Sequence, residues 1–328
     1  MVKIYSEFLL STALIIYFGF KLSQYGQIIS KKRFISEALF GVIFLAIITS
    51  LPEVITSIGS VTIVDAPNMA VSDAIGSILF NLMILALLDL IQGKGSILSE
   101  SNKSHALTAS LTIMMLGLIS LSLIQRTITN VGWGFMHVGY ESFLLILIYV
   151  LSTRALYKHS LEPGNLKDKK LEKVCHLWIK FIISAIIVVI SGFSLAKLGK
   201  DIALATGMSD TFVGLIFLAV VTSLPELIVS ISALRLGSVD MAVGNILGSN
   251  FFDTIIVPIT DIFYVKAQLL STISFSHIFT LTLCMVFSAI VISGLIYRSK
   301  KSFLRLGWDI IAIITIFALS IFFFYHIK

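Results

Sequence analysis

Long apolar stretches separated by short polar connectors follow one another along the whole chain. A helix needs about 20 apolar residues to cross the hydrocarbon core of a bilayer, and each stretch approaches or exceeds that length. Ten such stretches occur, near residues 5–25, 37–63, 69–92, 104–125, 138–156, 174–199, 210–234, 240–264, 273–297 and 304–326. The pattern therefore predicts an all-α membrane protein with ten transmembrane helices.

Composition supports a membrane protein. Of the 328 residues, 57% are hydrophobic and only 13% are charged, and the mean hydropathy is +1.00, values that no soluble globular chain of this length shows. The first stretch follows Lys3 and could be a cleaved signal peptide, but it lacks a small-residue cleavage site and has a counterpart in mid-chain. We predict that it is a retained span.

The net charge of +6 indicates membrane topology rather than nucleic-acid binding, because the basic residues lie in the short connectors. Cytoplasmic connectors carry the excess of Lys and Arg. If the N-terminus is outside, the outer side keeps only six of the 24 basic residues: Lys3, Arg126, Lys197, Lys200, Lys266 and Lys328. We therefore predict a multi-pass protein of the cell membrane with both termini extracellular.

One apolar motif with a polar end occurs twice. Residues 41–53 read GVIFLAIITSLPE, and residues 214–226 read GLIFLAVVTSLPE. Matches between the two regions extend over about 19–89 and 192–261, with the best-matched parts near 36–92 and 209–264. Such self-similarity predicts two copies of one structural unit.

Five predicted spans separate corresponding points of the two copies. Because five is odd, the second copy enters the membrane from the opposite side, which is the inverted repeat seen in many transporters. We predict a first five-helix half at 1–156, a cytoplasmic linker at 157–173 and a second five-helix half at 174–328. Two oppositely inserted halves suit alternating access to a central site.

Each motif brings several oxygen atoms to one face of a helix. Thr49, Ser50 and Glu53 are three or four positions apart, and Pro52 has no N–H, so backbone carbonyls near Ala46 are disturbed. The second copy repeats this pattern with Ala219, Thr222, Ser223 and Glu226. Oxygen ligands without thiols or imidazoles suit hard cations such as Na⁺ and Ca²⁺.

The partner segments carry similar chemistry. Gly76-Ser77 and Gly248-Ser249 are points where we expect helices to break or to be approached closely, and Asn81 and Asp253 follow four residues after each serine. Broken helices at the midplane would then aim Glu53, Glu226, Asn81 and Asp253 at one cavity. The hydroxyls could instead serve helix packing. The acids near the helix ends are expected to cap helices or to meet interfacial solvent: Asp89, Asp261 and Asp309.

These residues resemble a known family. The two Thr-Ser-Leu-Pro-Glu segments, together with Gly-Asn-Ile-Leu-Gly-Ser-Asn-Phe-Phe-Asp at 244–253, are similar to the alpha repeats of the sodium/calcium exchangers in the calcium/cation antiporter superfamily. The resemblance to its prokaryotic-type, short-loop members implies antiport of cytosolic Ca²⁺ for external Na⁺.

The resemblance also implies roles by position. Glu53 and Glu226 would be the central ligands of both ions, with the Ala46 and Ala219 carbonyls on Na⁺ and Asn81 as a neutral partner. By the same resemblance, the first and sixth spans would slide across the core to switch access. The flanking ligands would be Thr49, Ser50, Ser77, Thr222, Ser223, Ser249 and Asp253.

The first repeat departs from the family pattern. Ser72-Asp73 stands where the family usually has Gly-Asn, and Gly76-Ser77-Ile78 stands where it has Gly-Ser-Asn. Asp73 lies on the same helix face as Asn81 and is therefore a possible additional metal ligand. This leaves a Ca²⁺/H⁺ exchanger, or an exchanger of another divalent cation, as the alternative function.

Other function classes fit less well. A channel usually builds its pore from symmetric subunits, and an intramembrane aspartyl protease needs an aspartate dyad, whereas the paired acids here are glutamates. The six histidines show no ligand spacing, and the two cysteines are expected to be core residues. We therefore expect no enzyme activity, no cofactor and no nucleic-acid partner, with Ca²⁺, Na⁺ (or H⁺) and lipid as partners of a possible monomer.

Overall fold

The computed structural model describes residues 2–33, 36–93, 95–129, 132–160, 175–205, 219–299, 302–303 and 306–326. The described part is predominantly helical, with two short antiparallel hairpins. In chain order the elements are α1 (Val2–Arg33), α2 (Glu37–Leu39), the π-helix η1 (Phe40–Leu45), α3 (Ala46–Thr49), α4 (Leu51–Thr62), α5 (Pro67–Gln92), α6 (Ile97–Glu100), α7 (His105–Thr129), β1 (Gly134–Phe135), β2 (Val138–Gly139), α8 (Tyr140–Ser160), α9 (Cys175–Ala205), α11 (Ala219–Thr222), α12 (Leu224–Arg235), α13 (Val239–Phe263), α14 (Leu269–Thr272), α15 (His277–Tyr297), β3 (Ser302–Phe303), β4 (Leu306–Gly307) and α16 (Trp308–His326).

Eight of the ten predicted spans are confirmed as helical segments long and apolar enough to cross a membrane. The predicted span at 210–234 lies partly outside the described residues, as does the linker at 157–173. The last predicted span contains α16 (Trp308–His326), whose part Trp308–Ser320 is apolar but shorter than the eight spans above. The chain is therefore a multi-pass membrane protein.

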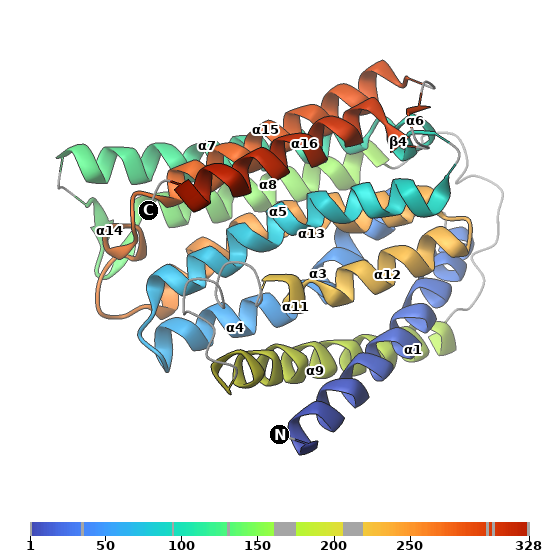
Figure 1. Ribbon diagram of the computed structural model, residues 1–328, viewed down its shortest axis with the longest axis horizontal. Coiled ribbons are helices and arrows are strands. Elements are labelled where there is room, and N and C mark those ends of the chain that lie inside the picture. Colours follow the sequence, from blue (N-terminus) through green and yellow to red (C-terminus); the bar gives the residue numbers. More distant parts are fainter. Residues whose placement is uncertain are drawn as a thin grey trace.

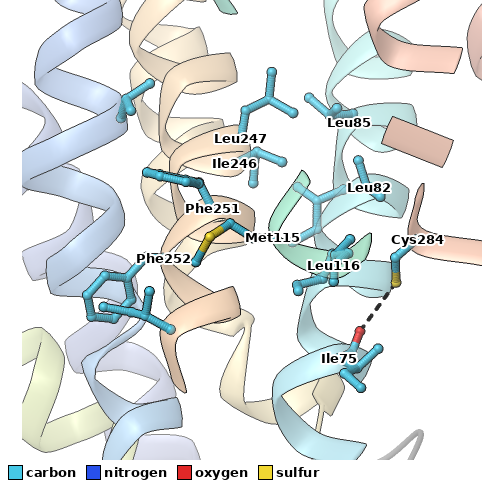
Figure 2. Close-up of a cluster of buried hydrophobic side chains, with 14 of the residues drawn as sticks. Ile75, Leu82, Leu85, Met115, Leu116, Ile246, Leu247, Phe251, Phe252 and Cys284 are labelled. Atoms are coloured by element: carbon cyan, nitrogen blue, oxygen red, sulfur yellow. Dashed lines mark hydrogen bonds between the residues drawn. The ribbon is translucent and has the colours of Figure 1, made fainter. Parts of the chain in front are cut away.

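The helices form three groups. Helices α5 and α13 run side by side through the middle of the molecule, α1 and α9 pack against each other on one side, and α7, α8, α15 and α16 lie on the other (Figure 1). Apolar side chains fill the space between α13, α5 and α7, where Leu247, Leu82 and Leu116 gather (Figure 2). The central helices are thus enclosed by protein.

The cysteine prediction is half correct. The buried Cys284 thiol donates to the carbonyl of Ile75 at 3.7 Å (Figure 2). Cys175 is exposed, so its assignment to the core was wrong. It is the first residue of α9, where the chain enters the helix from the polar linker, and helix ends are often exposed.

Two of the four predicted helix breaks occur. The chain leaves helical geometry at Ser50, between α3 and α4, and at Ser223, between α11 and α12. A π-helical turn, η1, precedes α3; such turns are common near functional sites. The breaks predicted at Gly76-Ser77 and Gly248-Ser249 are wrong, because α5 and α13 continue through these positions.

At Gly248 the missing side chain permits close approach instead of a break. A Cβ atom there would lie 2.4 Å from the carbonyl oxygen of Val42 and 2.8 Å from the Ala46 Cβ. Opposite, a Cβ on Gly41 would lie 2.5 Å from the carbonyl oxygen of Met241. The η1–α3 backbone therefore rests directly on α13.

A glycine on α9 touches both broken segments. A Cβ on Gly192 would lie 2.7 Å from the Cγ of Pro52 and 3.3 Å from the Cγ of Pro225. At its counterpart in the sequence repeat, Gly19 on α1, a Cβ would lie 3.2 Å from the Cγ2 of Ile228. Helices α1 and α9 thus lie against the segments that follow the two breaks.

The matching aspartates Asp89 and Asp261 cap corresponding loops. Asp89 accepts from the backbone N–H groups of Ile97 (2.5 Å) and Gly307 (2.9 Å). Asp261 accepts from those of Leu269 (2.6 Å) and Gly139 (2.9 Å). The capping prediction is confirmed, but interfacial solvation is wrong, because both side chains are buried. Each aspartate links the loop that follows its helix to a hairpin more than a hundred residues away.

Asp309 was also expected to cap a helix. Its side chain instead accepts a hydrogen bond from the hydroxyl of Ser96 at 2.8 Å.

A second pair of contacts follows the same register, between positions 172 residues apart. Asp240 contacts the His105 ring at 3.3 Å and accepts from the N–H of Asn102. Asn68 contacts the His277 ring at 3.2 Å and accepts from the N–H of Ser274. The likeness of the two regions therefore extends beyond the matched sequence into α7 and α15.

The close approach at Gly248 predicts a large effect of one methyl group. Gly248→Ala is expected to destabilise the protein by about 1–3 kcal/mol, because the new Cβ meets backbone atoms that cannot yield. Thermal unfolding in detergent measures this. Gly59→Ala is the matched control, since a Cβ at Gly59 meets nothing within 4 Å. Equal unfolding temperatures for the two variants would contradict the packing described.

Candidate ion-binding site

The same local geometry presents a glutamate in each copy. Ser50 has φ −87° and ψ 2°, and Ser223 has φ −83° and ψ 7°. A new helix begins directly after each serine, with proline near its start and with Glu53 or Glu226 in its first turn. A carboxylate is favoured at a helix N-terminus, where the backbone N–H groups and the helix dipole are positive. The break thus places an acid inside an apolar span.

Hydrogen bonds join the two copies at these breaks. The Ser50 hydroxyl donates to Glu226 Oε1 at 3.0 Å. The Thr49 and Ser249 hydroxyls lie 3.4 Å apart, and the Ser77 and Thr222 hydroxyls lie 3.5 Å apart. Each of these contacts links a residue of the first repeat to one of the second. The structure therefore brings both repeats to one place.

The central helices contribute an amide and a carboxylate. Asn81 Nδ2 on α5 lies 3.5 Å from Asp253 Oδ2 on α13, a long donor–acceptor contact. Glu53 lies within electrostatic range of the carboxylates of Glu226, Asp253 and Asp73. Four acidic side chains thus share one buried region between α4, α12, α5 and α13.

The site is closed to solvent in this structure. Twelve of the thirteen residues predicted from the sequence are at most 1% exposed, and the side chain of the thirteenth, Ala219, lies outside the described part of the chain. The twelve are Ala46, Thr49, Ser50, Glu53, Asp73, Ser77, Asn81, Thr222, Ser223, Glu226, Ser249 and Asp253.

Several of these buried oxygens have no hydrogen-bond partner among the described residues. They are both carboxylate oxygens of Glu53, Glu226 Oε2, Asp253 Oδ1, Asn81 Oδ1 and Ser223 Oγ. A buried carboxylate oxygen without a partner is costly. Hard cations take carboxylate, amide and hydroxyl oxygens as ligands. The donor set therefore fits a cation cargo such as Na⁺ or Ca²⁺.

Of the two predicted carbonyl ligands, those of Ala46 and Ala219, the structure gives contacts for Ala46. The Ala46 carbonyl accepts from the Ser50 N–H at 3.0 Å and contacts the Thr49 hydroxyl at 3.3 Å, so it lies beside the site. Ala219 is the first residue of α11. Within the described part of the chain, no three His, Cys, Asp or Glu side chains come together as a compact metal-ligand group. An ion held here would need mixed oxygen ligands.

Two asparagines of the site region were missed by the sequence reasoning. Asn245 Oδ1 lies 3.3 Å from the Thr49 hydroxyl, and its Nδ2 donates to Ser230 Oγ at 2.9 Å. Asn250 is buried, and neither polar atom of its amide has a partner among the described residues. Both residues lie in the 244–253 motif, so the available signal was the motif itself. Their side chains are neutral, so a search for buried charge does not identify them.

Comparison with known proteins places these features in a family. The family model described as "Sodium/calcium exchanger protein" matches residues 4–158 and 176–326, which confirms the resemblance found in the motifs. An uncharacterized membrane protein of Methanocaldococcus jannaschii is 28% identical over 220 residues, covering 67% of this chain and 68% of that protein. The sodium/calcium exchanger MaX1 of Methanosarcina acetivorans is 35% identical over 105 residues, which are 32% of this chain and 26% of MaX1.

A solved structure has the same fold. The sodium-calcium exchanger NCX_Mj, soaked with 2.5 mM Na⁺ and 10 mM Sr²⁺, aligns with a TM-score of 0.75 at 22% identity, and the alignment covers 98% of each chain.

The two carboxylate oxygens of Glu53 that lack a hydrogen-bond partner among the described residues predict an effect on the free energy of unfolding, which can be measured without transport. In buffer free of Na⁺ and divalent cations, Glu53→Gln is expected to stabilise the protein by on the order of 1–3 kcal/mol, because an amide costs less to bury than a charged carboxylate near other acids. Thermal unfolding in choline chloride measures this, with the exposed Glu7→Gln as control. A lower unfolding temperature for Glu53→Gln would show that the carboxylate itself holds the fold together.

Proposed function

Because this chain belongs to the sodium/calcium exchanger protein family, we propose that it is a secondary antiporter that exchanges Na⁺ for Ca²⁺ across the cell membrane. The observation that carries the proposal is the set of buried oxygens to which both Thr-Ser-Leu-Pro-Glu copies contribute, joined by the Ser50–Glu226 hydrogen bond.

In this proposal Glu53 and Glu226 are the central ligands. Their four carboxylate oxygens include three without a hydrogen-bond partner among the described residues. Asp253 supplies a third carboxylate and Asn81 a neutral oxygen beside it. The flanking ligands are Thr49, Ser50, Ser77, Thr222, Ser223 and Ser249, with the carbonyl oxygens of Ala46 and Ala219.

The proposed architecture is ten transmembrane helices in two inverted halves, 1–156 and 174–328, joined by a cytoplasmic linker at 157–173. Matched contacts support it. The Asp89 and Asp261 caps, the His105 and His277 contacts, and the hairpins before α8 and α16 occur at corresponding points of the two halves. Helices broken at Ser50 and Ser223 lie where such transporters build their binding sites.

Alternating access follows from the charge of the site. Three ionised carboxylates, those of Glu53, Glu226 and Asp253, balance three Na⁺, or one Ca²⁺ when one carboxylate is protonated. Because the two loads use the same ligands, they compete. A ligand shifts a conformational equilibrium only by its differential affinity for the two states. We infer that the empty, charged site resists the switch of access and that bound cations permit it.

Ion flux tests this function. Proteoliposomes loaded with Na⁺ are expected to take up tracer Ca²⁺ when external Na⁺ is removed, and a proton gradient alone is expected to drive no uptake. The reverse result would favour the Ca²⁺/H⁺ exchanger. Current far above the turnover of a carrier would favour a channel.

The glutamates should control this flux. Glu53→Gln and Glu226→Gln are each expected to lower Na⁺-driven Ca²⁺ uptake by at least about tenfold, because each removes a charged ligand worth on the order of 1.5–3 kcal/mol. Tracer uptake at low Ca²⁺ concentration measures the loss. The exposed Glu100→Gln is the matched control. Full uptake by either site variant would contradict the assignment of that glutamate.

The orientation can be tested by labelling. In a chain without its native cysteines, Asn130→Cys is expected to react with a membrane-impermeant maleimide in intact cells. Gly164→Cys in the linker is expected to react only after the cells are permeabilised, because the positive-inside rule places the linker in the cytoplasm. The opposite pattern would reverse the proposed topology.

A further inference from the structure

The two copies of the site exchange an acid and an amide at two matched positions. One is the pair Asn81 and Asp253, which lie in contact with each other, with 3.5 Å between Asn81 Nδ2 and Asp253 Oδ2. The other pair lies beside the flanking hydroxyls. Asp73 on α5 corresponds to Asn245 on α13, 172 residues later. The Thr222 hydroxyl lies 3.5 Å from Asp73 Oδ1, and the Thr49 hydroxyl lies 3.3 Å from Asn245 Oδ1. The carboxylate and the amide therefore occupy equivalent places beside equivalent threonines.

The surroundings of Asp73 are adapted to a carboxylate. Asn245 Nδ2 donates to Ser230 Oγ and lies 3.4 Å from the carbonyl oxygen of Glu226, and an aspartate cannot make such donations. In the first copy, the Thr56 hydroxyl lies 2.8 Å from Asp73 Oδ2 and 3.0 Å from the Glu53 carbonyl oxygen. The second copy has Val229 at the position of Thr56. In the first copy the Thr56 hydroxyl thus lies against the Asp73 carboxylate. In the second copy the Asn245 amide instead lies against the carbonyl oxygen of Glu226.

Among the described residues, the side chains that hydrogen-bond to this acid are hydroxyls, and none of them is basic. Asp73 is fully buried and accepts hydrogen bonds from two hydroxyls, those of Thr56 and Thr222. It lies within electrostatic range of Glu53 and Asp253. A buried carboxylate that accepts from hydroxyls and lies among other acids raises the negative potential around it.

That potential falls unequally on the two halves of the site. Thr222 contacts both Asp73 and Ser77, so the acid adjoins the Ser77–Thr222 pair of hydroxyls. The matching pair, Thr49 and Ser249, has the neutral Asn245 at the position of Asp73, and the carboxylate of Glu226 lies within reach of both its hydroxyls. Because Coulomb attraction weakens with distance, a cation at the Ser77–Thr222 pair gains more from Asp73 than a cation between the central glutamates.

We propose that Asp73 is a specificity-determining residue, which strengthens the binding of a monovalent cation at the Ser77–Thr222 pair. It thereby strengthens Na⁺ binding more than Ca²⁺ binding. This inference rests on the proposed function, because it assigns the flanking hydroxyls to Na⁺ and the central glutamates to both ions.

The test compares charge at the two matched positions in the full chain. Asp73→Asn is expected to raise the half-saturating Na⁺ concentration for Ca²⁺ exchange in proteoliposomes roughly tenfold, and the half-saturating Ca²⁺ concentration less than about threefold, since the charge lies beside the flanking pair. The double variant Asp73→Asn/Asn245→Asp moves the acid to the other copy and is expected not to recover the Na⁺ affinity, because position 245 faces the carbonyl oxygen of Glu226.

A second variant distinguishes a loss of Na⁺ affinity from a loss of folding. Asp73→Asn/Thr56→Val reproduces the Asn and Val of the second copy and is expected to show the same selective loss of Na⁺ affinity as Asp73→Asn. A direct measurement, the rise in unfolding temperature with added NaCl against choline chloride in detergent, should shift to higher Na⁺ concentration in both variants.

The outcomes separate the two proposals. Unchanged half-saturating Na⁺, or equal shifts for Na⁺ and Ca²⁺, would overturn the role of Asp73 while exchange itself stands. A wild type without Na⁺-driven Ca²⁺ flux would overturn the exchange function. In that case the Na⁺-dependent unfolding temperatures of wild type and Asp73→Asn still decide whether Asp73 favours Na⁺.

Discussion

The cost of burying acidic oxygens in a membrane protein governs the rest of this structure. Glu53 has both carboxylate oxygens without a partner among the described residues, and Glu226 and Asp253 each have one. In a medium of low dielectric constant such atoms are tolerated only where the surrounding structure supplies compensation. The helix starts at Leu51 and Leu224, the neighbouring hydroxyls and the amide of Asn81 all lie where they can provide it.

The surrounding helices provide the stiffness that this arrangement requires. Asp89 and Asp261 each bind a nearby loop and a distant hairpin, so the ends of α5 and α13 are tied to the segments that lead into α16 and α8. Close backbone contact at Gly41 and Gly248 leaves no free space between η1 and α13. The site is therefore carried on packed helices, with departures from regular α-helix at η1 and at the two serine breaks.

The sequence alone predicted most of the spans and the main acids, because both depend on local patterns. Apolar length identifies a span, and the duplicated Thr-Ser-Leu-Pro-Glu marks a polar interruption within one. The sequence does not tell whether a glycine breaks a helix or allows another backbone to pack closely against it, because that depends on residues far away in the chain. Gly248 is the clear case, because Val42 lies against it from a segment two hundred residues earlier. The role of Asn245 was missed for a related reason, as its partner Thr49 is equally distant in sequence.

The position of Gly192 has a mechanical consequence. A single backbone position on α9 rests on both Pro52 and Pro225, and each proline directly precedes a glutamate of the site. Any displacement of α9 along this surface disturbs both contacts in the same movement. A movement that opens the surroundings of one glutamate therefore also changes the surroundings of the other. Such coupling makes it harder for both glutamates to be open to opposite sides of the membrane at the same time.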